Sequence, residues 1–449
     1  MEREHITPQG VSVFHDKNEN IHSFCLCLYV RAGSLFETKK ENGISHFFEH
    51  IVFKNIHYAM GENLYQTLDR CGLDFNASTY EEFIQFIITG APAHFEEAAE
   101  ILTGIFAPFT LPEEAIDTER KRIKAEIREE DEESSLNYFT KQIAWKDTSL
   151  ERTITGKKKT LNKIRRKQLC AFQKKVLAAN NIFFYISGNY PESSLSVLTR
   201  LLEPYSFSFL KEERENIAPV PKRFGQRKPK IYVKNSKKTC VCFSVDIDAS
   251  RYTLAEKNLL FDILFEGEFC KIHQELSEKK GYVYSYDPCF QHYNNIGQMT
   301  LVYEVLPKHL YDSVETVIEV LKSMKEGITD ELSYVLPHYI DNAGFLLDDT
   351  EEFNWVRAYE GHILDVYYKD IEERTESYRS VTTERMTQIC QEVFRQSNIL
   401  LTIKGKKKKV DKERLSKILC TLAFLFLGFL RMEERFLGYN KVVYGGVML

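Results

Sequence analysis

The residues best suited to do chemistry stand in one short stretch, from Gly43 to His50. Asn42 and Gly43 are typical of helix starts, so the stretch is predicted to begin an amphipathic helix. Side chains in a helix advance by about 100° per residue, which places His46 and His50 on one face, one turn apart. Glu49 lies on the flank of that face. Two imidazoles with a carboxylate beside them can hold a hydrolytic zinc ion and a base next to its water.

The order His-x-x-Glu-His is the inverted form of the zinc-protease helix motif. In a chain with 12 histidines and 65 acidic residues, such a pentamer arises by chance in about a few per cent of cases. The alternative interpretation is a partly buried polar patch on a helix. The motif alone therefore leaves a metal site and a polar patch both open.

The composition is that of a globular chain. Its 449 residues are too many for one ordinary core, so two or three domains are expected. The net charge of −5 offers no basic excess for nucleic-acid binding. The first residues are charged and precede no apolar run, so no secretory signal is expected. The ten cysteines are scattered without a Cys-x-x-Cys pair, which favours thiols in a reducing compartment and predicts a cytoplasmic location.

Apolar patterns along the first half indicate the elements that must position the motif. Strands are predicted at 11–14, 21–30 and 83–89, a helix at about 61–71, and an extended segment at 72–79. A second helix follows Pro92, and Pro112 begins a long charged stretch, Glu113 to about Lys141, that is rich in helix formers and predicted to be helical.

Two carboxylates of that charged helix share a face. Glu119 and Glu126 are seven residues apart and therefore align to within about 20°. The other acidic residues around Glu126 are typical of a solvated helix face. Spacing alone does not tell which carboxylate turns toward a metal.

An internal repeat predicts a duplicated domain. Residues 164–188 correspond to residues 381–405 at a constant offset, and each block is a helix followed by Asn-Ile, an apolar strand and Gly. The helix after Pro92 has its counterpart after Pro307 at nearly the same offset. We predict a first domain at 1–211, a Pro- and charge-rich linker at 212–230, a second domain at 231–420 and an extension at 421–449.

The second copy lacks the motif, because its equivalent helix at 254–265 carries no histidine. Metal chemistry is therefore expected in the first domain only. The apolar run 418–430 is shorter than the roughly 20 residues that a membrane span needs, so a buried helix is predicted there and no membrane association.

With these residues in place, the chain resembles the inverzincin metallopeptidases of the pitrilysin/insulinase family, in the class that includes the mitochondrial processing peptidase subunits. The resemblance runs from about residue 10 to 420: residues 43–54 resemble the family's zinc helix, and residues 119–126 its downstream helix. It implies that His46, His50 and Glu126 bind Zn²⁺ and that Glu49 is the catalytic base. Glu119 matches a carboxylate that does not bind the metal itself but supports one of its ligands.

The resemblance also implies a fold and an activity. The fold class is α+β, with two tandem homologous α/β-sandwich domains that have helices on one face of a mostly antiparallel sheet and form half of a clam shell. The activity is zinc-dependent hydrolysis of peptide bonds in short or unfolded polypeptides. The alternative is a non-catalytic structural or binding subunit of the same fold.

Residues for substrate and partner follow from the same resemblance. Asn76 lies in a segment similar to the family's substrate-contacting strand, and Tyr284 lies in a similar glycine–tyrosine segment of the second half. An arginine that accompanies this tyrosine in several relatives is Ser277 here. A dimer is therefore expected, either with a related chain that carries the arginine or with a second copy of this chain.

Overall fold

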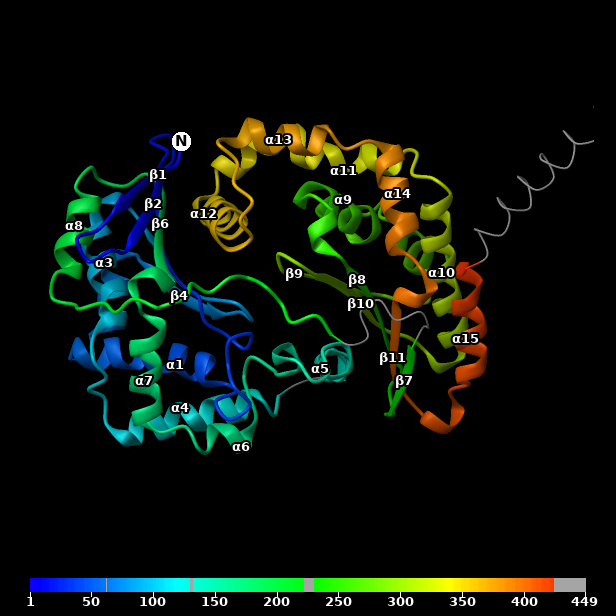
Figure 1. Ribbon diagram of the computed structural model, residues 1–449, viewed down its shortest axis with the longest axis horizontal. Helices are drawn as coiled ribbons and strands as arrows, with labels where there is room; N and C mark the ends of the chain where they lie inside the picture. Colours follow the sequence, from blue (N-terminus) through cyan, green and yellow to red (C-terminus); the bar gives the residue numbers. More distant parts are fainter. Residues whose placement is uncertain (62, 130–131, 222–229, 424–449) are drawn as a thin grey trace, which may run out of the picture. The chain divides into compact units, whose positions relative to one another are not determined.

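A six-stranded sheet and a five-stranded sheet organise the chain (Figure 1). The computed structural model describes residues 1–61, 63–129, 132–221 and 230–423. Two compact units emerge. The first comprises residues 1–221, 292–296 and 336–380, and the second comprises most of the remainder of the chain. The predicted α+β class with two sheet-and-helix units is confirmed.

The first sheet has the strand order β1-β2-β6-β3-β5-β4. Its strands are β1 (Arg3–Ile6), β2 (Ser12–Lys17), β3 (Phe24–Val30), β4 (Asp74–Thr79), β5 (Ile84–Gly90) and β6 (Ile182–Gly188). Neighbours are antiparallel except for the parallel pair β2–β6. Strand β4 is therefore an edge strand of the sheet.

One face of this sheet carries the helices that build the site. They are α1 (Ile44–Ala59), α2 (Leu64–Cys71), α3 (Phe95–Thr103), α4 (Glu113–Glu126), α7 (Arg166–Val176) and α8 (Ser194–Leu202). Strand β3 alternates, with Phe24, Leu26 and Leu28 in the core beneath these helices. Helices α1 and α4 contribute buried side chains to the same hydrophobic cluster: Phe47 and Phe48 from α1, and Ile116 and Ile123 from α4.

The opposite face of the first sheet is also covered. Its inward side chains, among them Cys25, Cys27 and Tyr29, pack against Ala358 and Ile363. These two residues belong to the π-helical turn Val356–Ile363, which follows α12 (Thr350–Trp355). Asn354 Nδ2 donates to the Tyr185 carbonyl at 3.1 Å. The segment 336–380, which the sequence analysis assigns to the domain 231–420, therefore packs with the first unit (Figure 1).

The second sheet has the order β7-β11-β8-β10-β9. Its strands are β7 (Lys230–Asn235), β8 (Cys240–Ile247), β9 (Tyr286–His292), β10 (Gly297–Glu304) and β11 (Ile399–Gly405), and its main helices are α9 (Leu254–Phe265), α10 (Leu310–Glu326), α14 (Thr383–Val393) and α15 (Lys412–Cys420). The parallel pair β7–β11 repeats the parallel pair β2–β6.

The repeat extends to single hydrogen bonds. Asn181 donates to the Val176 carbonyl at 2.7 Å, and Asn398 donates to the Val393 carbonyl at 2.9 Å. Each asparagine thus satisfies a carbonyl near the end of the preceding helix, which a helix leaves without an internal partner. The conserved geometry at the predicted offset is what a duplicated unit requires.

Two sequence expectations differ from the structure or fall partly beyond it. The charged stretch from Glu113 to about Lys141 forms two helices instead of one, because α4 ends at Glu126 and α5 (Glu132–Ala144) begins separately. Like charges three and four residues apart destabilise a helix, and this stretch is densely acidic. The apolar run 418–430 begins in α15, with Ile418 and Leu419 buried, but residues 424–449 lie outside the described residues.

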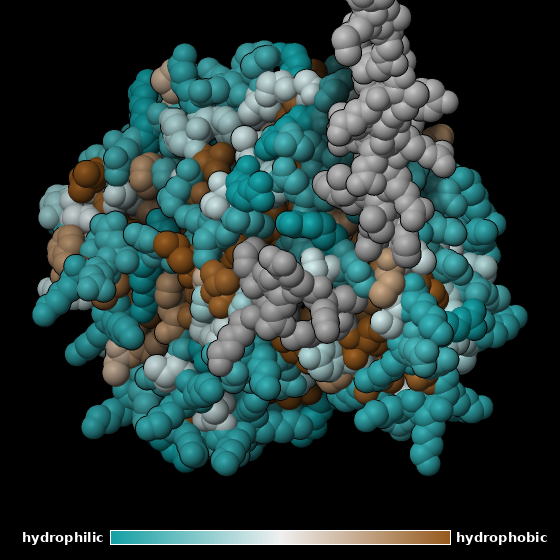
Figure 2. All heavy atoms as spheres, turned by 45° about the vertical axis from the view of Figure 1, so that its right-hand side comes forward, coloured by the Kyte–Doolittle hydropathy of each residue, from teal (hydrophilic) through white to brown (hydrophobic). Residues whose placement is uncertain are grey.

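Within the described ranges, no helix is both long enough and apolar enough to cross a bilayer. The face shown in Figure 2 is predominantly hydrophilic where it is coloured, and its hydrophobic side chains form several smaller groups.

Candidate metal centre

The N-terminus of helix α1 is hydrogen-bonded to a buried carboxylate, Glu37, that lies outside the motif. Glu37 accepts hydrogen bonds from the backbone N–H groups of Gly43 and Ser45, at 2.8 and 3.0 Å. These groups belong to the helix N-terminus, where an anion is stabilised by the helix dipole. Burial raises the pKa of Glu37, and its hydrogen bonds oppose that rise. The sequence prediction missed Glu37, because an acidic residue six positions before Gly43 falls outside the capping pattern.

Gly43 is required by close backbone packing at the same place. Its φ is +92°, in the left-handed region that favours glycine. A Cβ atom there would lie 2.8 Å from the Cα of Gly156. The helix can therefore start at this depth only because two glycines face each other.

The three predicted ligands converge. His46 Nε2 lies 3.6 Å from Glu126 Oε1, and His50 Nε2 lies 3.9 Å from Glu126 Oε2. One ligand atom from each residue lies within 4.8 Å of the others. The imidazoles of His46 and His50 are edge to face, with centroids 4.7 Å apart. Glu126 is the last residue of α4, so the site joins α1 to the end of that helix.

These distances fit a zinc ion. A tetrahedral zinc with bonds of about 2.0–2.1 Å separates its ligand atoms by about 3.3 Å, slightly less than the separations here. At 3.6 and 3.9 Å the nitrogens and oxygens are too far apart to hydrogen-bond to one another. Burial, with the charge of His50, lowers the pKa of His46 to about 3, so its imidazole is neutral and has a lone pair for a metal. The three side chains thus fit zinc better than they fit one another.

A buried carboxylate supports the second histidine. Glu119, only 2 % exposed, has Oε2 3.3 Å from His50 Nδ1. Arg122 donates to Glu119 Oε1 at 3.1 Å, and Lys54 Nζ lies 3.9 Å from the same atom. Burial opposes ionisation of Glu119, but the bond with His50 and the neighbouring cations outweigh it and lower its pKa. An ionised Glu119 orients His50 with Nε2 toward Glu126, as expected for a carboxylate behind a metal-binding histidine.

Arg120 holds helix α4 in place. Its Nε donates to the Leu161 carbonyl at 3.1 Å and its Nη2 to the Ile164 carbonyl at 2.7 Å. Its guanidinium also lies over the ring of Phe47 in α1, 5.3 Å from the ring centroid. Glu119 and Glu126 therefore reach α1 from a helix that is anchored on both sides.

Glu49 is positioned by a residue of the edge strand. The Thr79 hydroxyl, at the end of β4, donates to Glu49 Oε2 at 2.6 Å. Burial raises the pKa of Glu49, while the bond from Thr79 lowers it. A carboxylate with a raised pKa is a stronger base at neutral pH. Sequence reasoning missed Thr79, because its pairing with Glu49 depends on where β4 lies beside α1.

The two predicted substrate residues, Asn76 and Tyr284, are both exposed. Asn76 is exposed on β4, and its Oδ1 accepts from the Ala77 N–H at 2.9 Å. Side chains alternate along a strand, so Asn76 points to the face opposite that of Phe75 and Thr79. Tyr284 belongs to the second unit and is fully exposed. The Ser277 hydroxyl donates to the Val283 carbonyl at 2.9 Å.

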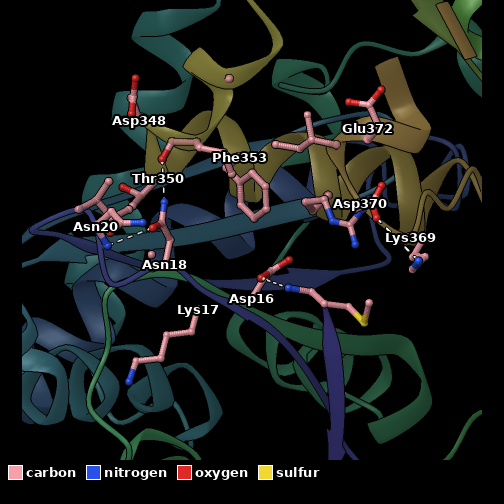
Figure 3. A pocket seen from close by; sticks show the side chains of 17 residues that line it. Asp16, Lys17, Asn18, Asn20, Asp348, Thr350, Phe353, Lys369, Asp370 and Glu372 are labelled. Atoms are coloured by element: carbon pink, nitrogen blue, oxygen red, sulfur yellow. Dashed lines mark hydrogen bonds and ion pairs between the residues drawn. The ribbon is translucent and has the colours of Figure 1, made fainter. Parts of the chain in front are cut away.

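A separate pocket of about 540 Å³ lies elsewhere in the first unit, between the end of β2 and the segment 344–372 (Figure 3). Its walls include Asp16, Thr350 and Phe353 and none of the three ligands. The charged groups that line it are largely paired: Asp16 with the terminal amine at 2.9 Å, and Lys369 with Asp370 at 4.0 Å. The pocket therefore shows no single charge preference for a ligand.

The chain is similar in sequence to known peptidases. Residues 12–158 match the model of the insulinase family of peptidases (family M16), and residues 163–333 match the model of the peptidase M16 inactive domain. An uncharacterized zinc protease of Bacillus subtilis, YmxG, is 20% identical over 404 residues, which cover 88% of this chain and 96% of that protein. The beta subunit of the mitochondrial-processing peptidase of Saccharomyces cerevisiae is 30% identical over 164 residues, 36% of each chain.

Solved structures share the fold. A protease from Helicobacter pylori superposes with a TM-score of 0.79 at 16% identity, over 90% of this chain and 99% of that one. The periplasmic protease PqqL from Escherichia coli gives a TM-score of 0.76 at 15% identity, over 94% of this chain but only 50% of PqqL. The first half of PqqL alone is covered to 97%. This chain therefore corresponds in fold to one half of that larger protein.

Proposed function

Because the chain belongs to the insulinase family of peptidases (family M16), we propose that it is a zinc-dependent endopeptidase that hydrolyses short or unfolded polypeptides. The observation that carries the proposal is the convergence of His46, His50 and Glu126, whose imidazole nitrogens and carboxylate are spaced for one zinc ion. Glu49 beside this cluster provides a base.

In the proposed mechanism, zinc would supply a Lewis acid for the scissile carbonyl and lower the pKa of a water to about 7. Glu49 accepts the proton of the attacking water and delivers it to the leaving amine. The Thr79 hydroxyl holds Glu49 in one orientation during both transfers. Glu119 keeps His50 oriented, so that its Nε2 remains available to the metal.

The edge of strand β4 is the proposed binding site for an extended peptide substrate. It pairs with β5 on one side, and within the described part of the chain no strand pairs with its other side. An extended peptide can add to such an edge through main-chain hydrogen bonds. Since Thr79 of this strand contacts Glu49, a peptide on β4 would run close to the base. Asn76 and Tyr284 are proposed to contact the substrate on the strength of the family resemblance.

A dimer is part of the proposal. One chain matches the length of one half of PqqL, so a second chain of the same fold is expected to supply the other half. Ser277 has neither the charge nor the reach of the arginine found in relatives, which favours a related partner over a second copy. A cytoplasmic location stays a prediction from the ten cysteines, all of which are free thiols.

The second candidate is a non-catalytic subunit of the same fold, favoured by the match of residues 163–333 to an inactive-domain model. The decisive test measures zinc content and turnover of an unstructured peptide library by the purified full chain, alone and with a chelator. The endopeptidase predicts one catalytic zinc and chelator-sensitive cleavage that Glu49→Gln abolishes. Zinc-free protein without turnover would favour the non-catalytic subunit, and cleavage that persists in Glu49→Gln would reject Glu49 as the base.

A further inference from the structure

A second group of potential metal ligands lies away from the candidate centre. Cys71, His94 and Glu97 each offer one ligand atom, and the three atoms lie within 4.8 Å of one another. This separation meets the same limit as that of the three ligands of the candidate centre. His94 Nδ1 lies 3.5 Å from Glu97 Oε1, close to the separation of two ligands on one zinc.

Three different elements bring the group together. Cys71 is the last residue of α2, His94 ends the 3-10 turn Pro92–His94, and Glu97 lies in the first turn of α3. Cys71 is buried, whereas His94 and Glu97 are half-exposed. The thiol therefore forms the floor of the group, and the imidazole and carboxylate form its solvent-facing side.

A simple ion pair accounts for only part of this arrangement. His94 and Glu97 are three residues apart, and a solvent-exposed pair of this kind stabilises a fold only weakly. The pair does not explain why a buried thiol lies beside it. The Nδ1 atom of His94 is itself buried and accepts or donates no hydrogen bond among the described residues. A nitrogen, a sulfur and an oxygen thus converge without satisfying one another.

We propose that Cys71, His94 and Glu97 form a second metal site, which binds Zn²⁺ or a similar borderline-soft divalent cation. Thiolate and imidazole select against Mg²⁺ and Ca²⁺, which prefer oxygen ligands. The fourth position faces solvent and takes a water. Binding converts the Cys71 thiol to a thiolate and releases its proton to the buffer.

The position of the site suggests a structural effect on strand β4. Cys71 is followed by Gly72 and Leu73 and then by β4, and His94 follows the end of β5. A metal here ties α2 to α3 at the end of the β4–β5 pair that is remote from Thr79. Six residues of strand separate the two ends by roughly 20 Å, so the two metals are independent sites. The second metal pins the edge strand without touching the reacting groups.

Cobalt substitution tests the proposal on the full-length chain. A thiolate ligand gives Co²⁺ an intense near-ultraviolet charge-transfer band, and the candidate centre has no thiolate. To isolate the second site, the His46→Ala, His50→Ala double variant is titrated with Co²⁺. We expect one equivalent of cobalt to bind with this band, and Zn²⁺ to displace it because zinc binds such ligands more tightly.

Matched variants assign the band. Cys71→Ala and His94→Ala should abolish it, while Cys170→Ala, which removes a half-buried thiol outside the proposed site, should retain it. Glu97→Gln should weaken cobalt binding at least about tenfold, and the exposed Glu100→Gln should not. If Cys71→Ala fails to fold, His94→Ala decides, because it keeps the thiol and alters a half-exposed position. Absence of the band at saturating cobalt, or its survival in His94→Ala, overturns the second site and leaves the proposed peptidase centre unaffected.

Discussion

The hydrogen bond between Thr79 and Glu49 gives a sharp test of the proposed chemistry. Thr79→Val removes the hydroxyl and keeps the shape of the side chain. At 2.6 Å the bond is in the short range of charge-assisted bonds, which contribute about 1.5–3 kcal/mol when the acceptor is ionised. If the bond persists in the transition state, its loss lowers kcat/KM by about 10- to 150-fold, since about 1.4 kcal/mol is tenfold.

The pH profile adds a second readout with a definite sign. Burial raises the pKa of Glu49, and the Thr79 hydroxyl counteracts this by stabilising the carboxylate. Thr79→Val should therefore raise the pKa of Glu49 further. Because the base acts when ionised, the acidic limb of kcat/KM should move to higher pH in the variant.

The assay is steady-state hydrolysis of a fluorogenic peptide from pH 4.5 to 9, with zinc content measured on each sample. Thr79→Ser keeps the hydroxyl and should stay near wild type. Ser196→Ala removes an exposed hydroxyl on α8, away from β4, and should change neither rate nor profile. Activity of Thr79→Val within about threefold of wild type, with an unmoved acidic limb, would refute the positioning role.

Three further predictions concern the ligands, their support and a buried acid. Glu49→Gln should retain zinc and lose at least about 100-fold in turnover, because an amide cannot accept the proton. Glu126→Gln should weaken zinc binding far more than Glu129→Gln. Equal zinc loss in these two variants would reject Glu126 as a ligand. Glu119→Gln should raise the zinc Kd by about 10- to 100-fold with unchanged circular dichroism, and an unaltered Kd would contradict its support of His50. Burial, with the charge of a neighbouring glutamate, raises the pKa of Glu82 to about 8 from 4.5. The unfolded state therefore binds fewer protons between these values, and folding stability should fall as pH rises from about 4.5 to 8, by at most about 1.4 kcal/mol per pH unit. Denaturant unfolding of Glu82→Gln should lack this contribution, and an unchanged slope would count against it.

Local patterns in the sequence determined the parts of this protein that depend on one helix or strand. His46, Glu49 and His50 share a helix face through periodicity alone, and α1 (Ile44–Ala59) is found where the motif placed it. The repeat was equally local, since each copy carries its own asparagine, and both asparagines make the same bond to the preceding helix. Glu126 needed the family resemblance as well, because several carboxylates near it have similar spacing.

Contacts between distant segments were decided only by the tertiary structure. Glu37 at the start of α1, Thr79 beside Glu49 and the pairing of Cys71 with His94 depend on how separate elements pack, and no periodicity within one element encodes that. The covering of the first sheet by residues 336–380 is of the same kind. Strand β3 hints at it, because Phe24–Val30 is buried at every position, as in a strand covered on both faces. The sequence of β3 does not identify the segment that packs on this second face. Burial requires only apolar contact, and any segment of suitable shape can provide it.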